Sequence, residues 1–194
     1  MNKNHLIRVK REFDVYVSLY NINKYPTDIY KIAKSSFSSL KPNEKQITEA
    51  LNWKYGNLGK SNYPDSHKLI IKEVVNSWKH FVSSSVTKSP KDTFHWWKER
   101  LSKGKFGRYI TIAFITHLIH NKKGIPIIDQ HNFRAMNYFM NNSVLSPNAK
   151  KNPSNWEDIE CLKIFISEIS KSFNKRNEDV DKFLMMFGKE LKKK

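Results

Sequence analysis

The stretch that decides the fold lies between residues 101 and 137, where the chain reads LSKGKFGRYITIAFITHLIHNKKGIPIIDQHNFRAMN. Residues 107–120 form the most apolar segment of the chain and predict a helix. Gly124 stands just past that segment, where a glycine commonly ends a helix. Asp129 directly precedes a second predicted helix, so its simplest role is that of an N-cap. The stretch is therefore predicted to form a helix, a turn, an acid and a second helix.

Helical periodicity also dominates the remainder of the chain, whereas alternating strand patterns are hard to find. Ser154 and Glu157 have the spacing of a capping box, and Asp92 is a further candidate cap. We therefore expect an all-α fold in which residues 1–194 form one two-lobed domain. The other expected helices cover residues 12–19, 27–40, 44–53, 65–82, 92–101, 154–173 and 178–191.

The chain is strongly basic, with 35 lysines and arginines against 18 acids and a formal net charge of +17. Such a surplus favours a polyanionic partner, above all double-stranded DNA. An anionic membrane surface is a weaker alternative, and a proteome rich in lysine would also produce the surplus. The amino terminus lacks the apolar core of a signal peptide, and no apolar run is long enough to cross a membrane. We expect a cytoplasmic monomer of bacterial or phage-associated origin.

Cys161 is the single cysteine, which excludes an internal disulfide, a thiolate zinc site and a cysteine-held iron–sulfur cluster. Its apolar neighbours predict a buried, inert thiol. His117 and His120 are three residues apart, a spacing that can hold a metal ion on a helix. Because the sequence places no third ligand near them, a hydrogen-bonded pair is the preferred interpretation. No metal and no cofactor are expected.

A basic turn is predicted at residues 102–107, between the helix that ends near Leu101 and the apolar helix. Glycines allow backbone amides to approach a phosphate closely, and the start of the next helix presents unpaired N–H groups. An ordinary solvated turn between two helices remains the alternative. In the first interpretation the DNA-binding residues are Lys103, Gly104, Lys105, Gly107 and Arg108.

The acid belongs to a longer pattern, Asp-x-His-x-Phe-Arg-x-x-Asn, formed by Asp129, His131, Phe133, Arg134 and Asn137. Gly107-Arg108-Tyr109 ends twenty residues before Asp129. This arrangement, over about residues 94–140, resembles the helix-hairpin-helix DNA glycosylase superfamily, the group of endonuclease III and the adenine-mismatch and 8-oxoguanine glycosylases. In that family a glycine-containing hairpin starts a helix, and a Val-Asp-x-His-x-x-Arg run supplies the catalytic aspartate.

The resemblance implies an active site between two helical lobes, with Asp129 as the catalytic carboxylate. Tyr109, Gln130 and His131 would support it. The chain departs from the family in its turn, which is longer and lacks the proline of the Leu-Pro-Gly-x-Gly hairpin. Tyr109 also stands where bifunctional members place a Schiff-base lysine, which implies base excision without strong AP-lyase activity.

A glycosylase must flip its target nucleotide out of the duplex, which requires a base pocket, a wedge and phosphate contacts. Aromatic side chains beside a cation are suitable for this, but the same rings also build cores. Trp96 and Trp97 are neighbours on a predicted helix and cannot face the same way, so at least one belongs to the core. The candidates for pocket or wedge are Trp53, Lys54, Tyr55, Trp96 and Trp97.

The sequence therefore favours a DNA glycosylase that acts on a damaged or modified base. Modified bacteriophage DNA, and hence antiviral defence, is one possible setting besides repair. The alternative is a non-enzymatic DNA-binding protein with a glycosylase-like helical frame. A two-metal nuclease is disfavoured, because Asp129 is the one well-placed acid.

Overall fold

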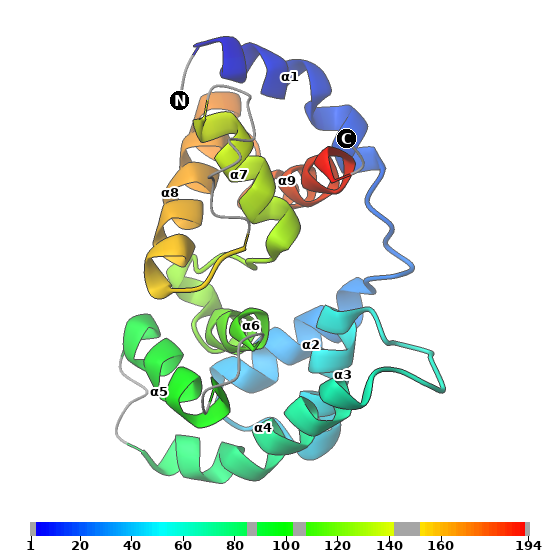
Figure 1. The fold of residues 1–194 in the computed structure, drawn as a ribbon, viewed down its shortest axis with the longest axis vertical. Helices are drawn as coiled ribbons and strands as arrows, with labels where there is room; N and C mark the ends of the chain where they lie inside the picture. The colour runs from blue at the N-terminus through cyan, green and yellow to red at the C-terminus, as the bar shows by residue number, and fades with distance from the viewer. Residues whose placement is uncertain (1–2, 85–88, 103–107, 142–151, 193–194) are drawn as a thin grey trace. The chain divides into compact units, whose positions relative to one another are not determined.

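The all-α fold class is confirmed. The computed structural model describes residues 3–84, 89–102, 108–141 and 152–192, and in these ranges it contains nine α-helices, one short 3₁₀ helix and no strand. The chain divides into two compact units (Figure 1). The inserted unit is continuous, Asn21–Ile125, whereas the terminal unit combines Met1–Tyr20 with Pro126–Lys194. The two ends of the chain therefore belong to the same unit.

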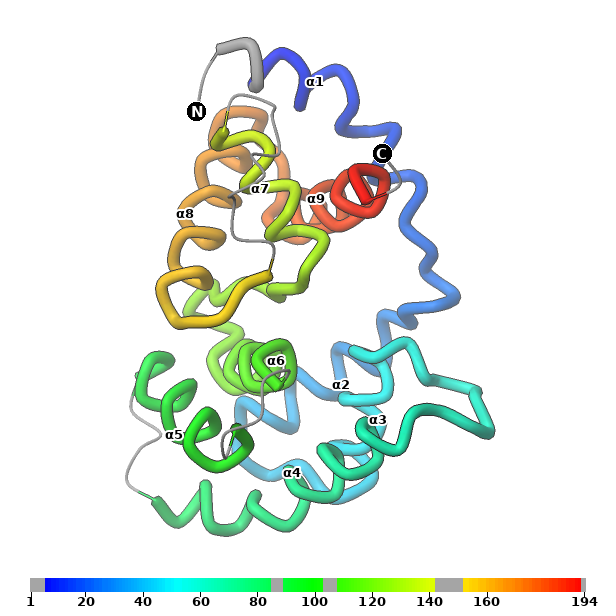
Figure 2. The backbone as a smooth tube through the Cα atoms, in the orientation of Figure 1, coloured from blue at the N-terminus to red at the C-terminus, as the bar shows by residue number. Residues whose placement is uncertain are grey.

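The inserted unit is built around its most apolar helix, α6 (Tyr109–Ile119). Every residue from Thr111 to Ile119 is buried, as expected of a helix that is hydrophobic on all sides. Helix α6 packs against α2 and α5, which lie on either side of it in Figure 2. The other elements of this unit are α2 (Thr27–Ser38), α3 (Glu44–Tyr55), α4 (Asp65–Ser83), α5 (Pro90–Ser102) and the 3₁₀ helix η1 (Asn121–Lys123).

Local sequence signals explain where these helices begin and end. Asn43 and Gln46 form a reciprocal capping box at the start of α3, and Gly56 ends that helix with a φ of 65°. Gly124 has a φ of 67° and ends η1, at the place where the sequence predicts a stop. Helix α5 starts at Pro90, because the Ser89 hydroxyl accepts the backbone N–H of Asp92. Ser89 rather than Asp92 is therefore the cap.

The terminal unit is organised by α9 (Asn177–Leu191), which packs against α1 (Lys3–Ser18), α7 (Gln130–Met140) and α8 (Trp156–Phe173). An aromatic cluster joins these helices. The rings of Phe13 and Phe183 stack with centroids 5.1 Å apart, and those of Phe139 and Phe187 stack at 4.8 Å. Arg8 donates to the hydroxyl of Tyr138 and so connects α1 to α7.

Three sequence expectations about the terminal unit are wrong. Its first helix begins at Lys3, not at residue 12, since Val9 and Phe13 form a buried face that extends the helix backwards. The capping box of α8 is formed by Asn155 and Asp158, one residue later than expected, because Asn155 adopts the extended backbone of an N-cap. Cys161 is exposed, since it lies on the outer face of α8.

Candidate functional site

Asp129 is held rigidly at the amino end of α7 in the terminal unit. Its Oδ1 accepts the backbone N–H groups of His131 at 2.8 Å and Asn132 at 3.1 Å. Its own N–H donates to the side-chain oxygen of Asn132 at 2.9 Å, which completes a capping box. The predicted N-cap role of Asp129 is therefore confirmed. The residue is half-buried, so the structure combines a fixed carboxylate with partial access to solvent.

Asn132 is the buried centre of this arrangement. Its side chain is 1% exposed and forms three hydrogen bonds. The amide oxygen accepts from Asp129, while the amide nitrogen donates to the carbonyl of Ile127 and, at 3.0 Å, to Oδ1 of Asp181 on α9. One side chain thus connects the segment before α7, the first turn of α7 and the neighbouring helix. Sequence reasoning missed Asn132, although its place three residues after the cap is a capping-box signal.

Two further motif residues, Arg134 and His131, brace this turn. Arg134 donates to the backbone carbonyl of Gly188 on α9 at 2.9 Å and to Nδ1 of His131 at 3.3 Å. Burial lowers the pKa of His131; nearby Asp129 opposes this shift, while Arg134 and Lys189 add to it. His131 is therefore uncharged at neutral pH. Gln130, the third expected supporting residue, is exposed at the first position of α7.

Of the five residues predicted to bind phosphate, the structure describes Arg108. Lys103, Gly104, Lys105 and Gly107 lie outside the described residues. Arg108 donates to the carbonyl of Leu101 at the end of α5 at 2.8 Å and forms an ion pair with Glu73 of α4.

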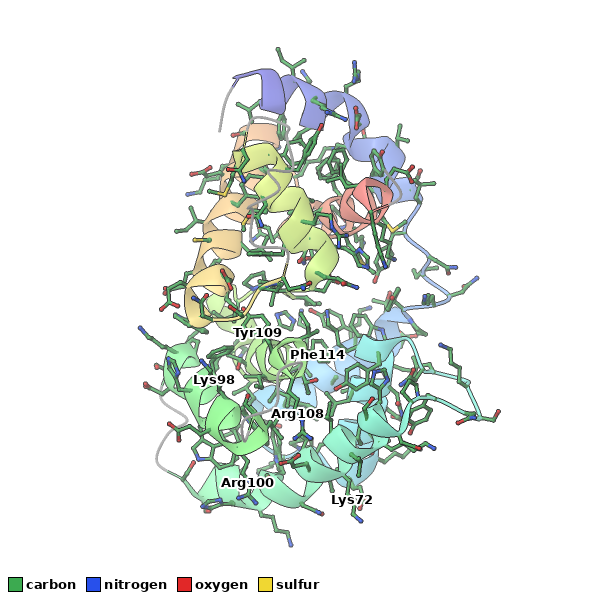
Figure 3. The ribbon with its side chains drawn as sticks, in the orientation of Figure 1. Lys72, Lys98, Arg100, Arg108, Tyr109 and Phe114 are labelled. Carbon is green, nitrogen blue, oxygen red and sulfur yellow. The ribbon has the colours of Figure 1, made fainter. Side chains whose placement is uncertain are left out.

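Arg108 is labelled in Figure 3 together with Arg100, whose guanidinium donates to Ser77 one turn further along α4 at 2.9 Å. Arg108 therefore links the end of α5 and the start of α6 to α4, and its positive charge is paired with the carboxylate of Glu73.

Tyr109 is the first residue of α6, in the inserted unit. It is half-buried, and its ring meets the edge of Phe94 with centroids 5.6 Å apart. This is the position at which the resemblance would place the lysine of a bifunctional enzyme. The residue there is a phenol, which forms no Schiff base.

The pocket and wedge candidates separate into core and surface. Trp97 is fully buried, which confirms that one of the neighbouring tryptophans belongs to the core. Trp53 is 6% exposed, stacks between Tyr30 and Phe114 at 5.0 and 5.7 Å, and donates its indole N–H to the carbonyl of Pro26. A ring enclosed in this way offers no face to a base, so both tryptophans belong to the core of the inserted unit.

Trp96, Lys54 and Tyr55 are partly exposed and remain candidates for a base pocket or wedge. Tyr55 stacks on His67 with centroids 4.1 Å apart, and its hydroxyl forms a hydrogen bond with Thr111 of α6. Burial raises the pKa of Tyr55 to about 12, so the phenol stays protonated. The Lys54 ammonium lies over the Phe114 ring, 5.7 Å from its centroid. The network that surrounds Tyr55 carried no signal in the sequence.

His117 and His120 have separate hydrogen-bond partners. His117 contacts the carbonyl of Ile125 through Nδ1 and the hydroxyl of Tyr30 through Nε2, each at 2.6 Å. His120 contacts the hydroxyl of Thr93 through Nε2 at 2.7 Å. In the part of the chain that the structure describes, no three histidine, cysteine or acidic side chains gather closely enough to bind a metal ion. The hydrogen bonds of the two histidines agree with the hydrogen-bonded interpretation of this pair.

Positive charge is distributed unequally between the two units. The inserted unit contains 19 of the 35 lysines and arginines but 7 of the 18 acids, so it carries +12 of the net charge of +17. Asp129 and its hydrogen-bond network belong to the other, less basic unit. The helices described here include none with the length and hydrophobicity needed to span a bilayer.

Comparison of the chain with protein-family models, with characterised proteins and with solved structures gives no match.

Proposed function

We propose that this protein is a DNA glycosylase that hydrolyses the N-glycosidic bond of a damaged or modified base, with Asp129 as the catalytic carboxylate. The observation that carries the proposal is the fixed carboxylate at the start of α7, inside the Asp-x-His-x-x-Arg pattern. Two backbone N–H groups hold its Oδ1, and the turn that supplies them is braced by Arg134.

The chemistry of base release requires such a group. Breaking the N-glycosidic bond builds positive charge on the deoxyribose, as in other oxocarbenium-like transition states. A carboxylate that is already oriented stabilises this charge without reorganising, and it can also accept a proton from the attacking water. The phenol of Tyr109 supplies no amine to attack the sugar, which favours a monofunctional enzyme without strong AP-lyase activity.

Helices α5 and α6 pack against each other, and the basic segment 103–107 lies between them in the sequence. The surplus of +12 in the inserted unit suits it to neutralising DNA phosphates, while the terminal unit provides the acid. The substrate is double-stranded DNA from which the target nucleotide is flipped. Enlarged bases of bacteriophage DNA are candidates beside oxidised and alkylated ones, and the protein would act as a monomer in the bacterial cytoplasm.

A non-enzymatic DNA-binding protein is the second candidate, and one observation favours it. Capping α7 is a complete structural role for Asp129, which needs no chemistry to explain the residue. The two functions make opposite predictions for the release of free base, so they can be separated by experiment.

The deciding experiment measures free base by mass spectrometry from duplexes with oxidised, alkylated, deaminated or glucosylated bases. Asp129→Asn is the matched variant, because asparagine also caps helices well and removes only the charge. We expect one substrate to lose its base with the wild type, at least a hundredfold less with Asp129→Asn, and equal DNA affinity for both proteins. Tight DNA binding without base release from any duplex would instead establish the binding protein.

A further inference from the structure

Helix α9 contacts Asn132, Arg134 and His131 in the amino-terminal part of α7, and two of these residues donate their backbone N–H groups to Asp129. Asp181 accepts from the side chain of Asn132 at 3.0 Å, and the carbonyl of Gly188 accepts from Arg134 at 2.9 Å. Gly188 also lies directly against the backbone of His131. These contacts are spread over two turns of α9, so they fix both the position and the rotation of the first turn of α7.

The contact at Gly188 leaves no room for a side chain. A Cβ atom added there would lie 1.9 Å from the carbonyl oxygen of His131 and 2.6 Å from its carbonyl carbon. Both are backbone atoms, which cannot move aside as the end of a flexible side chain would. His131 is also one of the two residues whose N–H groups hold the Asp129 carboxylate. A displacement of the His131 backbone would therefore disturb its hydrogen bond to the Asp129 carboxylate.

The contact at Asp181 completes the hydrogen bonding of a buried amide. Both hydrogens of the Asn132 side chain are used, one by the carbonyl of Ile127 and one by Asp181. Without Asp181, one donor of a side chain that is 1% exposed would lose its partner. Such a group turns toward another acceptor or toward water. Rotation of this amide would also move the oxygen that accepts the N–H of Asp129.

We propose that α9 positions the Asp129 carboxylate, with Asp181 and Gly188 as positioning residues that never touch the substrate. This inference rests on the proposed function for its effect on base release. Its structural part is that α9 maintains the hydrogen bonds between Asp129 and the first turn of α7, and this part is independent of any activity. The two parts have separate readouts.

The first readout is enzymatic and compares Asp181→Ala, Asp181→Asn and Asp179→Ala. Asp179 is a matched control, since it lies on the same helix and pairs instead with Arg176 and Lys182. We expect Asp181→Ala to lower kcat roughly 10²-fold, the effect of a small misplacement of a reacting group, while KM and DNA affinity stay unchanged. Asp181→Asn keeps an acceptor oxygen and should restore kcat, and Asp179→Ala should resemble the wild type.

The second readout is hydrogen–deuterium exchange at the backbone amides of His131 and Asn132, which donate to Asp129. In Asp181→Ala these amides should exchange at least about tenfold faster, and in Asp179→Ala at the wild-type rate. Unchanged exchange in Asp181→Ala would overturn the positioning role. If the wild type releases no base from any duplex, the proposed function fails, and the exchange rates alone then decide the inference.

Gly188→Ala provides a steric test of the same idea from another turn of α9. The added methyl group must push the backbone of His131 away, so the same two amides should lose protection. If Gly188→Ala does not fold, the Asp181 series still decides the question. A folded Gly188→Ala protein with wild-type exchange and wild-type kcat would count against the inference.

Discussion

Acidification from pH 7 to pH 5 is expected to destabilise the protein through His117. The carbonyl of Ile125 can only accept, so Nδ1 carries the proton and Nε2 accepts from the hydroxyl of Tyr30. Burial lowers the pKa of His117 to about 4; the Ile125 carbonyl opposes this shift, whereas Lys34 and Lys54 add to it. The folded protein therefore holds His117 as a neutral imidazole down to about that pH.

The sign of the effect follows from the order of protonation. As the pH falls, a histidine in the unfolded chain becomes protonated near pH 6.5, whereas His117 in the folded protein becomes protonated only at a lower pH. The stabilisation is complete above pH 6.5 and is lost as the pH falls from there toward about 4, the pKa in the folded protein. At pH 5 the loss from His117 alone amounts to about 2 kcal/mol of the free energy of unfolding. Burial also lowers the pKa of His120 to about 4, so it contributes in the same direction.

Urea unfolding at pH 7 and pH 5, for the wild type and for His117→Gln, measures this contribution. Glutamine does not titrate in this range, so the variant should lose about 2 kcal/mol less than the wild type between the two pH values, whatever its stability at pH 7. The remaining pH dependence of the variant is assigned to His120 and the other titrating groups. Equal losses in both proteins would refute the assignment to His117.

Two further predictions concern the cap of α7 and the charge of the inserted unit. Asp129→Ala should lower the free energy of unfolding by about 1 kcal/mol, which corresponds to a fall in Tm of roughly 2–4 °C. Asp129→Asn should stay closer to the wild type in the same thermal melt, and equal Tm values for the two variants would show that the cap adds no stability. DNA affinity, measured by fluorescence anisotropy, should fall steeply between 50 and 200 mM salt. In the same assay Lys72→Glu on α4 should weaken DNA binding more than the matched Lys171→Glu on α8. A flat salt dependence, or equal effects of the two reversals, would contradict a DNA-binding role for the inserted unit.

The sequence predicted those features that depend on neighbours along the chain. Periodicity located α6, and the position of Asp129 directly before a predicted helix predicted its cap, because both signals lie within a few residues. Long-range packing was invisible to the same reasoning. Nothing near Trp53 in sequence shows that Tyr30 and Phe114 will enclose it.

The same limit applies to the candidate site. Asp181 lies 49 positions from Asn132, and no periodicity connects two polar residues at such a separation. The start of α1 was missed for the same reason. Its basic residues obscured a buried face that packs against rings of α9, such as Phe183, which are far away in the sequence.

The discontinuous terminal unit also has a consequence for synthesis on the ribosome. The inserted unit is one uninterrupted segment, so all of its residues are made before residues 126–194 of the terminal unit. Helix α1 is made before the inserted unit, whereas Phe183, the α9 ring that stacks on Phe13 of α1, is made 170 residues after it. At about 5–20 residues per second, the exposed face of α1 waits on the order of ten seconds or more for that partner. During this interval the apolar face that Val9 and Phe13 form in the folded protein stays uncovered and can be bound by a chaperone.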